Sequence, residues 1–474
     1  MNTNIKAALI AGAVTAALST TALADGAAST DGTLTWNGVT LYGTIDAGVQ
    51  YNSAGSPQSD YFGPGSQELV AKNSRGSTAN VGGNYLSQSK VGLKGKELIA
   101  DGWSVVFKAE STFNPWSGQL TDGPRSQTSN NGKAAGVQNA AGDSSLAGQL
   151  FAGAAYIGVS NDTFGTVTFG RNTGILHDLI AVYDPQNNAY AFSPVGNSGT
   201  AAGVGDTEDR RLDDSVKYDV KIGSLHLGAQ FQTKSASNPG TAQEFAVGYG
   251  FDGGSIDAFY AQKNDAIATA SLAAADITTI GTVCAGTASA TTTATYACST
   301  DTSKTLAATI SDNTATGILG KYKFAGTTAT VYGGYEQIHY TNPSNAVAPG
   351  FTGLGGYIIA KVNNAAFPST KTLDISWLGV KYFVTPKWEV SGAYYRYDQN
   401  SYATGKNAGC SSAAVSGQCS GSENFVSFYA DYHATKRFDV YAGAMWNQVQ
   451  GGLANGFAYA TSTIDPTLGF RYNF

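Results

Sequence analysis

Short segments that alternate apolar and polar residues follow one another from residue 39 to the end of this chain. In the first of them, Leu41 and Ile45 share one face, whereas Tyr42 and Asp46 share the other. A period of two is typical of a β-strand with one apolar and one polar face. We count about sixteen such segments, so the pattern predicts an all-β fold.

The connections between the predicted strands alternate between short turns and long loops. Turns of about four residues, such as IADG at 99–102 and ATKR at 434–437, join the strands in pairs. Loops of roughly ten to forty residues separate one pair from the next. This alternation places the short turns on one side of the sheet and the long loops on the other. It favours an up-and-down antiparallel barrel over a sandwich.

The composition indicates that the barrel lies in a membrane. Charged residues make up 13% of the chain, against about 25% in an ordinary soluble domain. No apolar run approaches the length of about 18 residues that a spanning helix needs. A sheet in hydrocarbon must close on itself so that every backbone N–H and C=O is paired. We therefore predict one transmembrane domain over residues 25–474, in contact with the lipid bilayer and outer-leaflet lipid.

The first 24 residues have the three parts of a secretory signal peptide. Lys6 is followed by an apolar run at 8–18, and Ala22-Leu23-Ala24 matches a small-x-small cleavage site. A short N-terminal helix is the alternative, but this stretch would give it no polar face. Secretion without a helical anchor is consistent with the outer membrane.

The four cysteines form two local pairs in loop-like segments. An oxidising compartment permits disulfides there, and the short spacing favours Cys284–Cys298 and Cys410–Cys419. Free thiols remain an alternative. A metal site is disfavoured because neither pair has CxxC spacing or a neighbouring histidine.

The connection at 172–209 is too long for an ordinary loop inside a compact domain. Its first part has Ile175, Leu176, Leu179, Ile180 and Tyr183 at helical spacing, which predicts a short helix. Asn172 or Thr173 could cap this helix, and Asp184-Pro185 should end it. We expect the whole connection to fold into the barrel and to set the size and charge of a pore.

Five stretches in order carry a family resemblance. They are VTLYGTIDAG at 39–48, SKVGLKGKE at 89–97, FGTVTFGRN at 164–172, RLDDSVKYD at 211–219 and GFRYNF at 469–474. Together they resemble the general porins of Gram-negative outer membranes. The resemblance implies a homotrimer of sixteen-stranded barrels, each with its own aqueous pore for passive diffusion of ions and small hydrophilic solutes. It also implies that the third external loop forms the constriction.

The alternation of inward and outward residues along each strand predicts which charged residues face such a pore. A cation facing lipid at mid-depth costs about 2–4 kcal/mol, so basic residues on the polar faces should point inward. The expected basic wall comprises Lys90, Lys94, Lys96, Lys108, Arg171, Arg211, Lys217 and Arg471. The expected acidic loop comprises Asp178, Asp184, Asp206, Glu208 and Asp209. Cations facing carboxylates would make a transverse field that favours polar solutes.

Aromatic residues near the strand ends are expected to form the interface girdles of the barrel. They include Tyr394, Tyr395, Tyr397, Tyr429, Tyr432, Tyr472 and Phe474.

A substrate-selective channel for sugars or anions is the alternative to a general pore, and it would use the same barrel with a narrower constriction. An enzyme is disfavoured because the 4 histidines lie in different predicted elements, without a Gly-x-Ser-x-Gly or HExxH motif. We expect no cofactor. A nucleic-acid partner is disfavoured because 34 acidic residues outnumber 28 basic ones.

Overall fold

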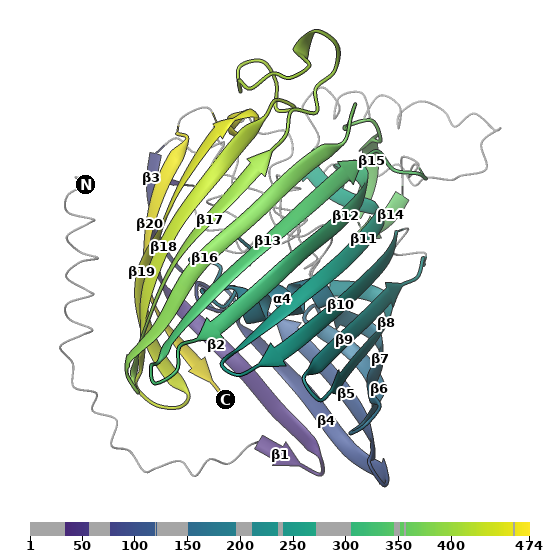
Figure 1. Ribbon diagram of the computed structural model, residues 1–474, viewed down its shortest axis with the longest axis vertical. Helices are drawn as coiled ribbons and strands as arrows, with labels where there is room; N and C mark the ends of the chain where they lie inside the picture. The colour runs from purple at the N-terminus through teal and green to yellow at the C-terminus, as the bar shows by residue number, and fades with distance from the viewer. Residues whose placement is uncertain are drawn as a thin grey trace.

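The computed structural model describes residues 34–55, 76–118, 120, 150–195, 211–235, 240–271, 305–345, 351–354, 357–457 and 460–474. These residues form a barrel of inclined strands, with the short turns at its lower end in Figure 1. The predicted signal peptide, residues 1–24, lies outside the described residues.

The barrel wall contains sixteen antiparallel strands, as predicted. They are β2 (Val39–Gly55), β4 (Lys90–Ala100), β5 (Trp103–Thr112), β6 (Ala154–Asn161), β7 (Gly165–Thr173), β8 (Arg211–Ile222), β9 (Leu225–Gln232), β10 (Thr241–Phe251), β11 (Gly254–Ser271), β12 (Thr305–Lys323), β13 (Ala329–Thr341), β16 (Lys371–Thr385), β17 (Trp388–Gln399), β18 (Gly421–His433), β19 (Phe438–Gly451) and β20 (Ser462–Asn473). The wall closes where β2 pairs with β20, from Thr44 opposite Asn473 to Gln50 opposite Thr467.

Four shorter strands extend this wall, and the sequence did not predict them. β1 (Leu34–Trp36) and β3 (Gly76–Gly83) both pair with β2. β14 (Phe351–Leu354) and β15 (Tyr357–Asn363) form a hairpin that lengthens the sheet beside the start of β12. All but β1 lie in segments that read as loops because their alternation is short.

The break between β3 and β4 is held by one buried carboxylate. Asp46 accepts hydrogen bonds from the backbone N–H groups of Tyr85, Leu86 and Ser87, at 3.2, 3.1 and 2.9 Å. The same strand β2 can therefore pair with β4 over its first half and with β3 over its second half.

The two faces of the strands differ as the alternation predicts on β2, where Leu41 and Ile45 are exposed and Asp46 is buried. On β16 the exposed face is again apolar, but the buried face is largely apolar too. Leu373 and Ile375 are almost fully buried there. The expectation of a uniformly polar interior is therefore wrong for this part of the barrel.

Aromatic pairs gather at the short-turn end of the barrel. They are Trp103–Phe164, Phe251–Tyr322, Trp388–Tyr432 and Tyr472–Phe474, with ring centroids 4.8–6.4 Å apart. Tyr395, Tyr397 and Tyr429, in contrast, are at most 1% exposed. Their assignment to an interface girdle is wrong because their parity places them on the buried face.

Helical structure is limited in the described residues to α4 (Ile175–Tyr183) and two 3₁₀ turns, η5 (Gly405–Asn407) and η6 (Gly452–Ala454). None of these helices is long and apolar enough to cross a membrane.

The predicted disulfide Cys410–Cys419 is present, with its Cα atoms 4.7 Å apart. It lies in the connection between β17 and β18, and its two cysteines are nine positions apart in the sequence. Cys284 and Cys298 lie outside the described residues.

Depth along the outer face should decide the effect of an introduced cation. Leu378, in the middle of β16, is 62% exposed, and Leu98, beside the 101–102 turn, is 72% exposed. If this face meets lipid, Leu378→Arg should lower the free energy of unfolding by about 2–4 kcal/mol and Leu98→Arg by about 0–1 kcal/mol. Urea unfolding in lipid vesicles, followed by tryptophan fluorescence, would measure both. Equal losses would argue against a lipid-facing surface.

Candidate functional site

The helix α4 begins against the wall of the barrel rather than with a side-chain cap of its own. Its N-cap is Gly174, which has no side chain to cap the helix. Asn172 and Thr173 belong to β7, so neither occupies the N-cap position. The expected caps are therefore wrong. A carboxylate from β10 takes their place: Glu244 Oε2 accepts a hydrogen bond from the Leu176 N–H at 3.0 Å. An anion at this end also suits the helix dipole.

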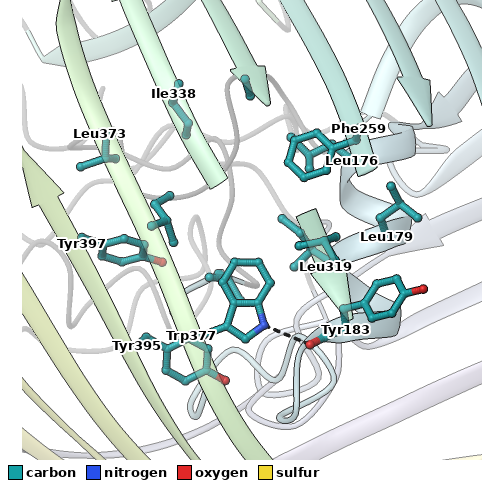
Figure 2. Close-up of a cluster of buried hydrophobic side chains, with 14 of the residues drawn as sticks. Leu176, Leu179, Tyr183, Phe259, Leu319, Ile338, Leu373, Trp377, Tyr395 and Tyr397 are labelled. Carbon is teal, nitrogen blue, oxygen red and sulfur yellow. Dashed lines mark hydrogen bonds between the residues drawn. The ribbon is translucent and has the colours of Figure 1, made fainter. Parts of the chain in front are cut away.

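One face of α4 packs into an apolar cluster (Figure 2). Its buried side chains are those predicted by helical spacing, namely Ile175, Leu176, Leu179, Ile180 and Tyr183. They belong to one cluster with buried side chains from β10–β13 and β16–β19. Figure 2 shows Trp377 reaching the end of the helix, where its Nε1–H donates to the Tyr183 carbonyl oxygen at 3.0 Å. We call the buried side chains of α4, β10–β13 and β16–β19 in this cluster the apolar cluster.

Asp184 ends the helix, as predicted, and then organises the chain that follows. Its carboxylate accepts hydrogen bonds from the N–H of Gln186 at 3.2 Å, the N–H of Asn188 at 2.7 Å and the Tyr395 hydroxyl at 2.5 Å. Burial raises the pKa of Asp184, although these hydrogen bonds lower it in part. Asp184 is 0% exposed. The prediction that its charge faces a pore is wrong, since it holds backbone groups.

The chain from 185 to 195 continues across the buried faces of the next strands. Ser391 Oγ donates to the Pro185 carbonyl at 2.8 Å, and Gln186 Nε2 donates to Ser427 Oγ at 2.6 Å. Phe192 then packs against Tyr429, with ring centroids 5.4 Å apart.

The far end of this chain reaches the bend between β3 and β4. The Ala191 N–H donates to the Tyr85 carbonyl at 2.9 Å. Residues 174–195, which we call the crossing segment, therefore contact the wall from β10 to the neighbourhood of β2. These contacts place a helix and a turn against buried faces on widely separated strands.

Of the predicted acidic loop residues, Asp178 alone is described with an exposed carboxylate. Its side chain is 49% exposed and forms an ion pair with Lys217 of β8. This pair joins α4 to β8, and the placing of the two charges in a pore stays a prediction. Asp206, Glu208 and Asp209 lie outside the described residues.

Three lysines on β4 and β5 surround Tyr42 and Glu110. Lys108 Nζ lies 3.2 Å and Lys90 Nζ 3.6 Å from Glu110 Oε2, which also accepts the Tyr42 hydroxyl at 2.9 Å. Lys94 Nζ lies 5.1 Å from the centre of the Tyr42 ring. The Lys90 and Lys108 side chains keep 35% and 27% of their surface exposed, and Lys94 is exposed. We call Lys90, Lys94 and Lys108 the lysine cluster.

The other predicted cations have polar partners nearby. Arg171 pairs with Asp213, and Arg211 is buried with its Nε–H donating to the Gly153 carbonyl at 2.7 Å. Lys96 lies 3.9 Å from Asp162 at the short-turn end, with 59% of its side chain exposed.

Arg471 is the last of the predicted cations. It pairs with Asp431 and Asp439 of neighbouring strands. These two acids and Glu110 were not predicted as pore residues, although strand parity places them beside the cations.

Comparisons with known proteins agree with this architecture. The sequence profile described as Gram-negative porin matches residues 11–452. An outer-membrane porin protein of Bordetella pertussis is 27% identical over 220 residues, which span 46% of this chain and 44% of that relative. The match thus covers less than half of the relative.

Solved structures share the fold at low identity. The anion-selective porin from Comamonas acidovorans has a TM-score of 0.56 at 16% identity, covering 92% of this chain and 99% of that one. In-vitro folded OmpT of Vibrio cholerae, in its trimer form, has a TM-score of 0.52 at 14% identity, covering 92% and 99%.

Removing the Asp184 carboxylate should loosen the crossing segment and leave the barrel closed. Asp184→Ala leaves the N–H groups of Gln186 and Asn188 and the Tyr395 hydroxyl without this acceptor, at a cost of about 1–3 kcal/mol for each group that stays buried and unpaired. Hydrogen exchange read by mass spectrometry should show faster exchange over 184–195 and unchanged exchange in β2 and β20. Asp178→Ala, which removes a half-exposed carboxylate, is the matched control. Equal effects of the two variants would contradict this role.

Proposed function

This chain belongs to the Gram-negative porin family of outer-membrane proteins, and on that premise we propose that its barrel is a water-filled channel. Ions and small hydrophilic solutes would cross it by passive diffusion. The closed wall supports this proposal because it leaves a protein interior separated from lipid.

We propose that the crossing segment is the constriction of this channel, within the connection expected at 172–209. It contacts the buried faces of strands from β10 to β19 and the bend before β4. The apolar cluster occupies the side of β10–β13 and β16–β19. The passage would therefore run beside β2 and β4–β8, where Lys90, Lys108, Glu110 and Lys217 lie on the inward face.

The lysine cluster is the observation that supports a positively charged passage. Lys90 and Lys108 share one nearby carboxylate, Glu110, and the exposed Lys94 lies over the Tyr42 ring, whereas Asp184 on the facing segment is buried and Asp178 is paired with Lys217. A constriction with unbalanced positive charge raises the local concentration of anions. Our second candidate is thus an anion-preferring channel of the same fold.

We propose further that Arg171, Arg211, Lys217 and Arg471 contribute to this basic wall. Arg171, Lys217 and Arg471 are each paired with a carboxylate, so each adds less field than an exposed lysine. Arg211 is buried and donates to the Gly153 carbonyl. Lys96 would lie at the short-turn mouth, beside Asp162.

A homotrimer is the proposed assembly. The trimer form of OmpT, a protein of the same fold, supports this proposal. Cross-linking of detergent-purified protein would measure the subunit number.

A passive channel is preferred to an outer-membrane enzyme. His177, His226, His339 and His433 lie on α4, β9, β13 and β18, so the described structure distributes the imidazoles over four elements. Esterase and protease turnover by the purified protein would test the alternative.

Neutralising the lysine cluster should move ion preference toward cations. We expect Lys90→Gln, Lys94→Gln and Lys108→Gln, combined, to shift the reversal potential in a salt gradient in the cation-selective direction, because three positive charges are removed while the Glu110 carboxylate remains. Single-channel recording in planar bilayers would measure the shift. Lys387→Gln, in the turn between β16 and β17, is the matched control for loss of a lysine.

An unchanged reversal potential in the triple variant would contradict the proposed passage along β4 and β5. Absence of conductance in the wild type would contradict the channel itself. Current that a sugar blocks in a saturable way would favour a solute-selective channel instead.

A further inference from the structure

We propose that Asp431, His433 and Asp439 form a binding site for a divalent transition-metal ion such as Zn²⁺. One ligand atom from each side chain lies within 4.8 Å of the other two. Oxygen and imidazole nitrogen are ligands that Zn²⁺ accepts in proteins. The site belongs to the β18–β19 hairpin, close to the short turn at 434–437, and is separate from the crossing segment.

Sheet register brings the three side chains together. Asp431 and His433 are two residues apart on β18, so they share a face of the sheet. His433 is directly opposite Asp439 on β19, with its Nδ1 atom 2.8 Å from Asp439 Oδ1. A rigid hairpin thus fixes the ligand positions, as a metal site requires.

Arg471 holds one side of both carboxylates. It lies directly opposite Asp439 on β20. Its Nε donates to Asp439 Oδ2 at 2.8 Å, and its Nη2 lies 2.7 Å from that oxygen and 3.4 Å from Asp431 Oδ2. Such outer hydrogen bonds orient ligating carboxylates in known metal sites. Two carboxylates exceed one guanidinium, so negative charge remains for a cation.

One carboxylate oxygen of the group is buried without a hydrogen-bond partner. Asp431 is 2% exposed, and its Oδ1 atom is the one left unpaired. Burying such an acceptor without a partner costs free energy, so this oxygen is open to a ligand. Asp431 Oδ2 lies 4.0 Å from His433 Nδ1, and a cation bound by both carboxylate oxygens would also satisfy Oδ1.

His433 gives a metal ion access to the site from water and determines which metal ions the site prefers. Its side chain is 28% exposed, so an ion can reach the site from water. The Phe383 ring stacks on the imidazole, with centroids 6.0 Å apart. Imidazole favours zinc, copper, iron and nickel, whereas Mg²⁺ and Ca²⁺ prefer oxygen alone. Three protein ligands leave one tetrahedral position of Zn²⁺ for water.

Calorimetric titration of the detergent-purified full chain with ZnCl₂ tests the site. We expect one Zn²⁺ per chain, with the dissociation constant rising about tenfold or more in His433→Gln and in Asp439→Asn. His339→Gln is the matched control, since His339 on β13 bonds Gln337 at 2.8 Å and lies outside the group. Circular dichroism and heat-dependent gel mobility would establish that each variant is folded.

Several outcomes would overturn the proposal. They are no Zn²⁺ binding by the wild type, equal affinity in His433→Gln and His339→Gln, and Mg²⁺ or Ca²⁺ binding as tight as that of Zn²⁺.

A second measurement, which depends on the proposed channel, would follow the reversal potential with and without Zn²⁺. A dication beside Arg471 should shift it toward anion selectivity in the wild type but not in His433→Gln. Calorimetric binding without this shift would support the site and count against a passage beside Arg471. The two measurements therefore separate failure of the metal site from failure of the channel.

Discussion

Hydrogen bonding between the first and last strands of the wall is the constraint on which this structure depends. Gly43 and Phe474 exchange backbone hydrogen bonds of 3.0 Å in both directions, and the pairing continues from Thr44 to Gln50 of β2. An open edge in hydrocarbon would leave a row of unpaired N–H and C=O groups, each costing several kcal/mol. The other edge of β2 is shared between β3 and β4, which the Asp46 carboxylate makes possible by holding the bend between them.

Closure creates an interior that the chain fills unevenly. Along β10–β13 and β16–β19, apolar side chains form one cluster with α4, whereas the lysine cluster and its Glu110 partner occupy β4 and β5. The crossing segment joins the two sides. Its polar backbone groups are satisfied by Glu244, Asp184, Ser391 and Tyr85, each from a different place in the chain. Such pairing is what permits irregular backbone inside a barrel.

Much of the wall could be predicted from the sequence because period-two alternation is a local signal. The turn at 434–437 and the inward parity of Tyr42 and Asp46 needed no long-range information, and the turn predicted at 99–102 lies at 101–102. The disulfide Cys410–Cys419 followed from short spacing.

The failures have a common physical cause. A buried face looks the same in sequence whether water or an apolar segment covers it, so Tyr395, Tyr397 and Asp184 were assigned to solvent or lipid interfaces. The helix cap was missed because its acceptor, Glu244, is distant in the chain from Leu176. The partners of the wall cations were missed for the same reason, since Asp431 and Asp439 approach Arg471 only through strand pairing.

The packing of α4 also bears on how wide the proposed opening can become. Five of its side chains are almost fully buried, and exposing each to water costs about 1.5–3 kcal/mol. Swinging the helix away from the wall would thus cost on the order of 10 kcal/mol, before any loss of hydrogen bonds. Thermal motion would then almost never populate such a state. The proposed opening would therefore keep a constant width and would not be gated by movement of α4.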